Sequence, residues 1–271
     1  VSDPVLIRGD GQFLYTLASV CDDVDFGITN VVRGSDHVTN TATQIQIIES
    51  LGGNVPDFSH HSLLTGSKGE PLSKRLGTLS LRDLRANGLE PMAILSYMSR
   101  LGSSEAIELF DNIDDLAENF DISNFGAQPT KFDLTDILPL SKKYISGLDV
   151  SEVYDNLKAS GVPSDIAPNF WLIVRENIST RAEIKHWWSI CSEGVTPVID
   201  KEDIQFIEIA KSLLPVGNFD ENTWKNWTSE IKAITGRKGK TLFMPLRKAL
   251  TGMEHGPDMS RLLPLLQKIN I

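Results

Sequence analysis

Long apolar runs, paired cysteines and targeting signals are all missing from this sequence. No apolar run approaches the ~20 residues of a membrane-spanning helix, and no signal peptide is visible, so we expect no membrane partner. The two cysteines, Cys21 and Cys191, lie far apart and form neither a CxxC pair nor a zinc pattern. A reducing, cytoplasmic setting is therefore the simplest expectation.

A nucleophile with a partner base is also missing. No Ser/His/Asp or Cys/His arrangement stands out, and the pairs Asp22-Asp23 and His60-His61 lack a third ligand type at metal-binding spacing. The sequence therefore predicts no metal site and no covalent catalysis. The chain begins at Val1 without an initiator Met, and we expect it to be the back portion of a longer protein.

Charge is unevenly distributed along a chain of otherwise ordinary composition. The 271 residues carry a net charge of -10, which weighs weakly against a nucleic-acid partner. Residues 104–130 nevertheless hold seven acids and no Lys or Arg, whereas 231–253 hold six bases and no acid. A segregated basic surface can bind phosphates on an acidic protein, because screening confines the field to about 8–10 Å. Alternatively, the basic segment is a solvent-exposed helix face without a binding role.

The first 75 residues are typical of an α/β unit. Residues 5–8 and 12–15 flank a Gly-Asp-Gly turn and predict a hairpin, and 28–33 predict a buried strand. A capping-box pattern, Thr41-x-x-Gln44, predicts the start of a helix that Gly52 ends. Ligands of such sheets bind at the carboxyl ends of the strands, where residues 33–37 would lie.

From residue 79 onward the sequence predicts helices, with Pro91 at a first helical position and Gly102 past that helix's end. The fold class is therefore α/β followed by all-α, with boundaries near 102–105 and 194–197. Apolar residues recur at helical spacing over seven further segments: 150–160, 166–176, 181–191, 201–214, 221–235, 245–250 and 259–269.

Two side chains of the α/β unit have open interpretations. Arg33 follows an apolar strand segment, so it could cap the strand end or clasp a carboxylate with its two-pronged guanidinium. Tyr15 could be a core residue or a hydroxyl donor to a substrate. The segment 236–241 fails the phosphate-loop spacing because residue 234 is Ile rather than Gly, so a basic RNA-contacting turn is favoured.

Three blocks together resemble a known family. They are 27–37 with its Arg-Gly-Ser-Asp-His end, 66–77 with Leu-Ser-Lys-Arg at 72–75, and 239–257 with Gly-Lys-Thr-Leu-Phe-Met-Pro-Leu-Arg at its start. Nearly the whole chain is similar to the carboxyl-terminal portion of bacterial-type glutamyl-tRNA synthetases, which are class I enzymes. The half that carries the HIGH motif is missing.

The resemblance implies a fold and three domains. These are the second half of a Rossmann-like catalytic domain at 1–103, a helical stem-contact and first anticodon-binding region at 104–195, and a helical anticodon-binding region at 196–271. The helical tail argues against a glutaminyl relative, which would have a β-barrel there. The family implies ATP-dependent ligation of glutamate to tRNA through a glutamyl-adenylate, with ATP and Mg2+ required.

The resemblance also implies roles for single residues. Lys74 is expected to be catalytic, as a lysine on a mobile loop that meets charge on the departing pyrophosphate. ATP contacts are expected at Asp36, Leu64, Ser73, Lys74 and Arg75, glutamate contacts at Tyr15, Ser19 and Arg33, and tRNA contacts at Arg237, Lys238, Lys240 and Arg247.

The sequence departs from the family pattern at two positions. Pro71 stands where the loop motif usually opens with Lys, and Ser19 stands where relatives carry Asn. Because the HIGH half is absent, we expect this chain alone to be inactive. A non-catalytic tRNA-binding protein is the alternative function, and the loop around Lys74 argues against it.

Overall fold

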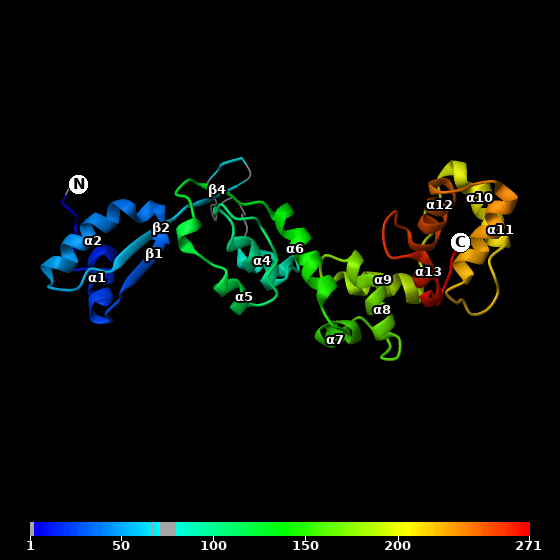
Figure 1. Ribbon diagram of the computed structural model, residues 1–271, viewed down its shortest axis with the longest axis horizontal. Coiled ribbons are helices and arrows are strands. Elements are labelled where there is room, and N and C mark those ends of the chain that lie inside the picture. Colours follow the sequence, from blue (N-terminus) through cyan, green and yellow to red (C-terminus); the bar gives the residue numbers. More distant parts are fainter. Residues whose placement is uncertain (1–2, 67, 71–79) are drawn as a thin grey trace. The chain divides into compact units, whose positions relative to one another are not determined.

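The computed structural model describes residues 3–66, 68–70 and 80–271, and the chain forms two compact units (Figure 1). Unit 1 comprises Val1–Leu79 and Ser96–Leu134, and unit 2 comprises Ser80–Leu95 and Thr135–Ile271. All the strands of the described residues lie in unit 1. The predicted order of an α/β region followed by helices is confirmed. The three-way division at 103 and 195 stays a prediction.

The centre of unit 1 is a parallel pair of strands, β1 (Asn30–Gly34) and β2 (Asp57–His61). Helix α1 (Tyr15–Asp25) packs against α2 (Val38–Ser50), and both lie near the strand pair (Figure 1). The predicted hairpin is reduced to one antiparallel bridge between Ile7 and Phe13, because Tyr15 already begins α1. The prediction of a buried strand was wrong, because Val32 is 56% exposed and β1 has β2 as its one neighbour among the described residues.

The start of α2 also differs from the prediction. A short 3-10 turn, Ser35–His37, leads straight into α2 at Val38, so Thr41 already lies inside the helix. Its hydroxyl donates to the His37 carbonyl instead of capping, and Gln44 is buried and donates to Ser19. The predicted end is confirmed, since the chain leaves the helix through Gly52 at a positive φ of 73°.

The rest of unit 1 surrounds a second, very short parallel pair, β3 (Leu64–Thr65) and β4 (Thr130–Lys131). Buried Arg100 bonds two residues of the acidic stretch, Glu105 at 2.7 Å and Glu108 at 3.3 Å. Helix α5 (Ile113–Glu118) and the 3-10 turn Ile122–Asn124 complete this region. The acidic stretch is thus partly neutralised by a cation that precedes it in the sequence.

Every regular element in the described residues of unit 2 is a helix or a 3-10 turn. Helix α4 (Pro91–Met98) begins at Pro91 as predicted and passes into unit 1, whereas α6 (Leu134–Gly147), which contains Pro139, was not predicted. Helix α12 begins at Lys240, five residues before the predicted start. The other helices are α3 (Leu81–Ala86), α7 (Val150–Ala159), α8 (Ala167–Val174), α9 (Glu183–Glu193), α10 (Ile204–Ser212), α11 (Thr223–Thr235), α12 (Lys240–Thr251) and α13 (Met259–Leu262).

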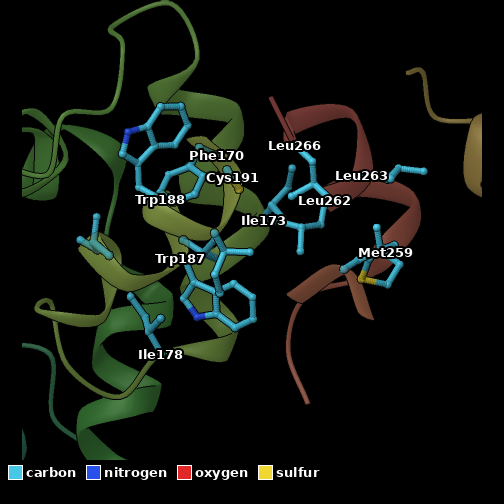
Figure 2. Packing of buried hydrophobic residues seen from close by; sticks show 14 of the residues in the cluster. Phe170, Ile173, Ile178, Trp187, Trp188, Cys191, Met259, Leu262, Leu263 and Leu266 are labelled. Carbon is cyan, nitrogen blue, oxygen red and sulfur yellow. The ribbon is translucent and has the colours of Figure 1, made fainter. Parts of the chain in front are cut away.

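The core of unit 2 is rich in tryptophan. Figure 2 shows Trp188 of α9 beside Phe170 of α8, with Leu262 and its neighbours from the end of the chain on the other side of the cluster. Phe170 and Trp188 meet edge to face, with ring centroids 5.4 Å apart. The indole N–H of Trp171 donates to a backbone carbonyl at 2.9 Å, so this ring is buried without an unpaired donor. No helix of the described residues is both long and apolar enough to span a membrane.

Candidate functional site

Arg33 lies near the carboxyl end of β1, where the sequence placed it. Its terminal nitrogen Nη2 donates to Thr41 Oγ1 at 2.7 Å, and its guanidinium lies 5.1 Å from the centroid of the Phe58 ring. Its Nε is buried and unbonded, and no carboxylate of the described residues pairs with it. A partly buried cation without an acidic partner can bind an anion from outside the chain.

Thr41 joins Arg33 to its surroundings. Its hydroxyl lies 2.9 Å from His60 Nε2 and 3.3 Å from the carbonyl of His37. His60 is the register partner of Arg33 in the parallel strand pair, so both side chains leave the same face. The sequence suggested a capping role for Thr41 and a structural role for His60; the bond of Thr41 to Arg33 and that of His60 to Thr41 were missed.

The predicted substrate residue Tyr15 is near the same helix start. Its ring is 55% exposed and meets the His37 ring edge to face, with centroids 5.9 Å apart. Ser19 lies one turn further along α1, and its hydroxyl accepts from Gln44 Nε2 at 3.1 Å. Tyr15 is therefore not a core residue.

Asp36 lies in the turn between β1 and α2. Its carboxylate is 3.9 Å from His37 Nε2 and more than half exposed. A Cβ added at Gly34 would come within 2.5 Å of Asp36 Oδ1 and 3.1 Å of the Leu63 side chain. A side chain at position 34 would therefore displace the Asp36 carboxylate from this position.

Leu64 borders an apolar cavity of about 230 Å³ within unit 1. The other walls come from the strand ends, from the end of α4 and from the 3-10 turn near residue 122; they are Val32, His61, Ser62, Met98, Leu101, Phe120, Ile122 and Phe125. Because Val32 and Arg33 alternate along β1, this cavity lies on the face opposite Arg33. Ser73, Lys74 and Arg75 lie outside the described residues, and so does Pro71.

The basic segment of unit 2 divides into paired and unpaired cations. Arg237 forms an ion pair with Asp203 and lies 4.2 Å above the Phe206 ring. Arg247 donates to the carbonyl of Pro257 at 2.9 Å, and burial lowers the pKa of its guanidinium. Both arginines of the predicted tRNA set thus have structural contacts within unit 2.

The lysines of the same set are free. Lys238 and Lys240 are exposed and form no ion pair with any residue that the structure describes. Lys240 opens α12 beside a cavity of about 650 Å³ whose walls include Thr241, Met244 and Pro245. Lys248 on the same helix is paired with Asp200 at 2.6 Å.

Two protein-family profiles match the chain. A profile of the family described as tRNA synthetases class I (E and Q), catalytic domain, matches residues 1–139, just over half of the chain. The chain belongs to this family of class I synthetases. A second profile, described as an anticodon binding domain, matches residues 171–271 of the class I synthetase chain.

The class I synthetase chain is similar to curated bacterial proteins over almost its whole length. It is 63% identical to glutamate–tRNA ligase 1 of Roseobacter denitrificans over 269 residues, covering 99% of the chain and 61% of that relative. The identity to glutamate–tRNA ligase 2 of Jannaschia is 58%, covering 98% of the chain and 60% of the relative. The chain thus spans about three fifths of these relatives. The predicted resemblance to glutamyl-tRNA synthetases is confirmed.

Solved structures share the fold of the class I synthetase chain. The crystal structure of a glutamate-tRNA synthetase from Elizabethkingia anophelis has a TM-score of 0.75 and 21% identity, covering 98% of this chain and 59% of that one. A glutamate tRNA ligase from Elizabethkingia meningosepticum, in complex with its amino acid, has a TM-score of 0.76 and 21% identity, covering 98% and 60%. At this identity the likeness supports the fold class.

Proposed function

We propose that this class I synthetase chain is part of an enzyme that ligates glutamate to tRNA with ATP, through a glutamyl-adenylate. The names of relatives at 56–63% identity support this substrate. The observation that carries the proposal is Arg33, a partly buried guanidinium at the end of β1 without a carboxylate partner among the described residues. We propose that Arg33 binds a carboxylate of glutamate.

Tyr15 and Ser19 are proposed to complete the glutamate contacts. The exposed Tyr15 hydroxyl can donate to the substrate, while Ser19 holds its own hydroxyl toward Gln44. In the first half-reaction the α-carboxylate of glutamate attacks the α-phosphorus of ATP, and pyrophosphate leaves. No protein nucleophile is needed, so the protein contributes positioning and charge stabilisation.

ATP contacts are proposed at Asp36, at the backbone of Leu64 and at the loop residues Ser73, Lys74 and Arg75, with Lys74 stabilising charge on the departing pyrophosphate. Mg2+ usually keeps several waters and binds through phosphates with one or two carboxylates. The described part of the chain has no group of three or more His, Cys, Asp or Glu side chains that could hold a metal ion. We therefore propose that any Mg2+ is carried mainly by the ATP phosphates.

The tRNA contacts are proposed for unit 2, with Lys238 and Lys240 as the primary phosphate ligands. They are exposed, have no ion-pair partner among the described residues, and lie within the segment that matches the anticodon binding domain. Arg237 and Arg247 remain in the proposed set, although their intramolecular bonds give them a structural role as well. Binding through phosphates depends strongly on salt.

The substitution Arg33→Lys tests the glutamate proposal in the full-length protein that contains this chain. Lysine keeps the charge and loses the two-pronged geometry, so one charge-assisted hydrogen bond worth about 1.5–3 kcal/mol is lost. We expect kcat/KM for glutamate in tRNA charging to fall about 100-fold. Arg8→Lys is the matched control, because Arg8 is exposed and bonds the exposed Gln12.

Each outcome of this experiment separates the alternatives. Wild-type protein that binds tRNA and never charges it with glutamate would favour the non-catalytic tRNA-binding function. Active wild-type protein with an unaffected Arg33→Lys variant would reject Arg33 as the carboxylate ligand.

A further inference from the structure

We propose that Thr41 and His60 are positioning residues that hold the Arg33 guanidinium in place for the substrate carboxylate. This inference rests on the proposed function, because it assumes that Arg33 binds glutamate. Neither residue is expected to touch the substrate. Their role comes from three contacts that converge on one hydroxyl oxygen, Thr41 Oγ1.

The donors and acceptors around this hydroxyl allow one arrangement in which every contact is a hydrogen bond. A threonine hydroxyl has one hydrogen and two lone pairs, and arginine can only donate. Arg33 therefore takes one lone pair at 2.7 Å. The His37 carbonyl can only accept, so it takes the hydroxyl hydrogen at 3.3 Å. The remaining lone pair is left for His60, which must donate from Nε2 at 2.9 Å.

This count assigns the proton of His60 and fixes the hydroxyl from three directions. His60 carries a hydrogen on Nε2, and its donation prevents the hydroxyl hydrogen from turning away from the His37 carbonyl. The lone pair that faces Arg33 is then permanently available. His60 thus acts on Arg33 through Thr41, although the structure shows no hydrogen bond between His60 and Arg33.

The guanidinium of Arg33 has little else to hold it. Its Nε is buried and has no hydrogen-bond partner among the described residues. The Phe58 ring, whose centroid lies 5.1 Å from the guanidinium carbon, limits the tilt of the guanidinium plane but not its rotation within that plane. A free arginine side chain loses about 2 kcal/mol of rotamer entropy when it is ordered. The bond to Thr41 orders the side chain before the substrate binds, so less entropy is lost on binding. The hydrogens of Nη1 and the second hydrogen of Nη2 remain as donors for a carboxylate.

The test measures tRNA charging by the full-length enzyme carrying Thr41→Val, which is nearly isosteric and lacks the hydroxyl. We expect KM for glutamate to rise about 10-fold, as for the loss of one hydrogen bond to a charged group. KM for ATP and kcat should stay near wild type, because the lost contact acts on glutamate binding alone. Thr41→Ser restores the hydroxyl and should restore KM.

Thr43→Val is the matched control on the same helix. Thr43 is buried and makes no side-chain hydrogen bond to another described residue, so its substitution should leave KM for glutamate unchanged. A purely structural role for Thr41 would instead lower the active fraction, and with it the apparent kcat, at constant KM.

A double-mutant cycle with His60→Phe tests the second positioning residue. His60→Phe keeps an aromatic ring and removes the Nε2 donor, and alone it should raise KM for glutamate about 3-fold. In the Thr41→Val background it should have no further effect, because its action passes through the missing hydroxyl. Independent, multiplying effects would overturn the role of His60.

The failure of this inference is distinguishable from that of the proposed function. If wild-type enzyme charges tRNA with glutamate but Thr41→Val has a wild-type KM, the positioning role is wrong and the function stands. If the wild-type enzyme shows no glutamate-dependent charging, the proposed function itself fails.

Discussion

Unit 1 and unit 2 differ in how they bury apolar surface. Of the twelve largest fully buried side chains among the described residues, ten belong to unit 2, and unit 1 contributes Tyr97 and Ile48. The strand pair of unit 1 leaves Val32 more than half exposed, whereas the core of unit 2 buries Trp187 and Trp188 (Figure 2). Unit 1 thus presents polar side chains from a thin sheet, and unit 2 gains its stability from packing.

Mutations in the two units should therefore have different effects. In unit 2 the loss of a buried group removes many contacts and should reduce stability. In unit 1 the important contacts are single hydrogen bonds around Arg33 and Thr41, whose loss should change ligand binding before stability. Three predictions test this contrast.

The largest expected effect is on the core of unit 2. Trp171→Ala should lower the free energy of unfolding of unit 2 by about 3–5 kcal/mol, because it leaves a cavity and removes the bond to the Leu148 carbonyl. Val32→Ala in unit 1 should change stability by no more than about 0.5 kcal/mol. All five tryptophans lie in unit 2, so fluorescence in urea follows that unit alone.

Hydrogen exchange supplies the corresponding measurement for unit 1, where no tryptophan reports. Equal losses of protection in both units after Trp171→Ala would contradict the contrast, since they would mean that one core stabilises the whole chain.

The second prediction concerns a buried ion pair of unit 2. Arg181 donates two hydrogen bonds to the Glu90 carboxylate, at 2.8 and 3.1 Å, and the Glu90 side chain is only 7% exposed. These bonds raise the pKa of Arg181. Glu90→Gln should cost about 1.5–3 kcal/mol in urea unfolding, because a hydrogen bond to a charged group is weakened.

Glu208→Gln, an exposed change on α10, is the control for this pair. If both substitutions had the same small effect, the pair would not contribute to unit 2, and packing alone would explain its stability.

The smallest effect is expected on the unpaired lysines. Lys238→Ala and Lys240→Ala should each weaken tRNA binding by the full-length protein and reduce the slope of log K against log salt by about 1, without a loss of stability. Arg237→Ala should also destabilise unit 2, because Asp203 and Phe206 lose their partner. Salt titrations of tRNA binding and urea unfolding of each variant measure the two effects separately. An unchanged slope in both lysine variants would exclude them as phosphate ligands.

The sequence predicted the helices best where a single apolar face repeats. Helices α7 and α11 follow the predicted segments closely, since each buries one stripe of side chains. Helix α6 was missed because Pro139 lies inside it. The start of α2 was misplaced because a capping pattern can also occur within a helix, where the hydroxyl bonds the carbonyl four residues earlier.

The residues proposed for the site could be named from the sequence, but the contacts among them could not. Arg33 and Tyr15 were singled out by their chemistry and by a family resemblance. The partner His60 was not, because it is brought to Arg33 by strand register, a long-range property that spacing along the chain does not encode. Likewise, the pairing of Arg237 with Asp203 joins positions 34 residues apart.

The two cysteines are buried to different extents and should therefore differ in their reactivity toward thiol reagents. Cys191 is inside the tryptophan core, where burial raises the pKa of its thiol to about 12 and suppresses the reactive thiolate. Cys21 is only partly buried and lies on α1, the helix that carries Tyr15 and Ser19. A maleimide dye should therefore attach at one position of the unmodified sequence, next to the proposed glutamate contacts, without any cysteine being engineered in or out.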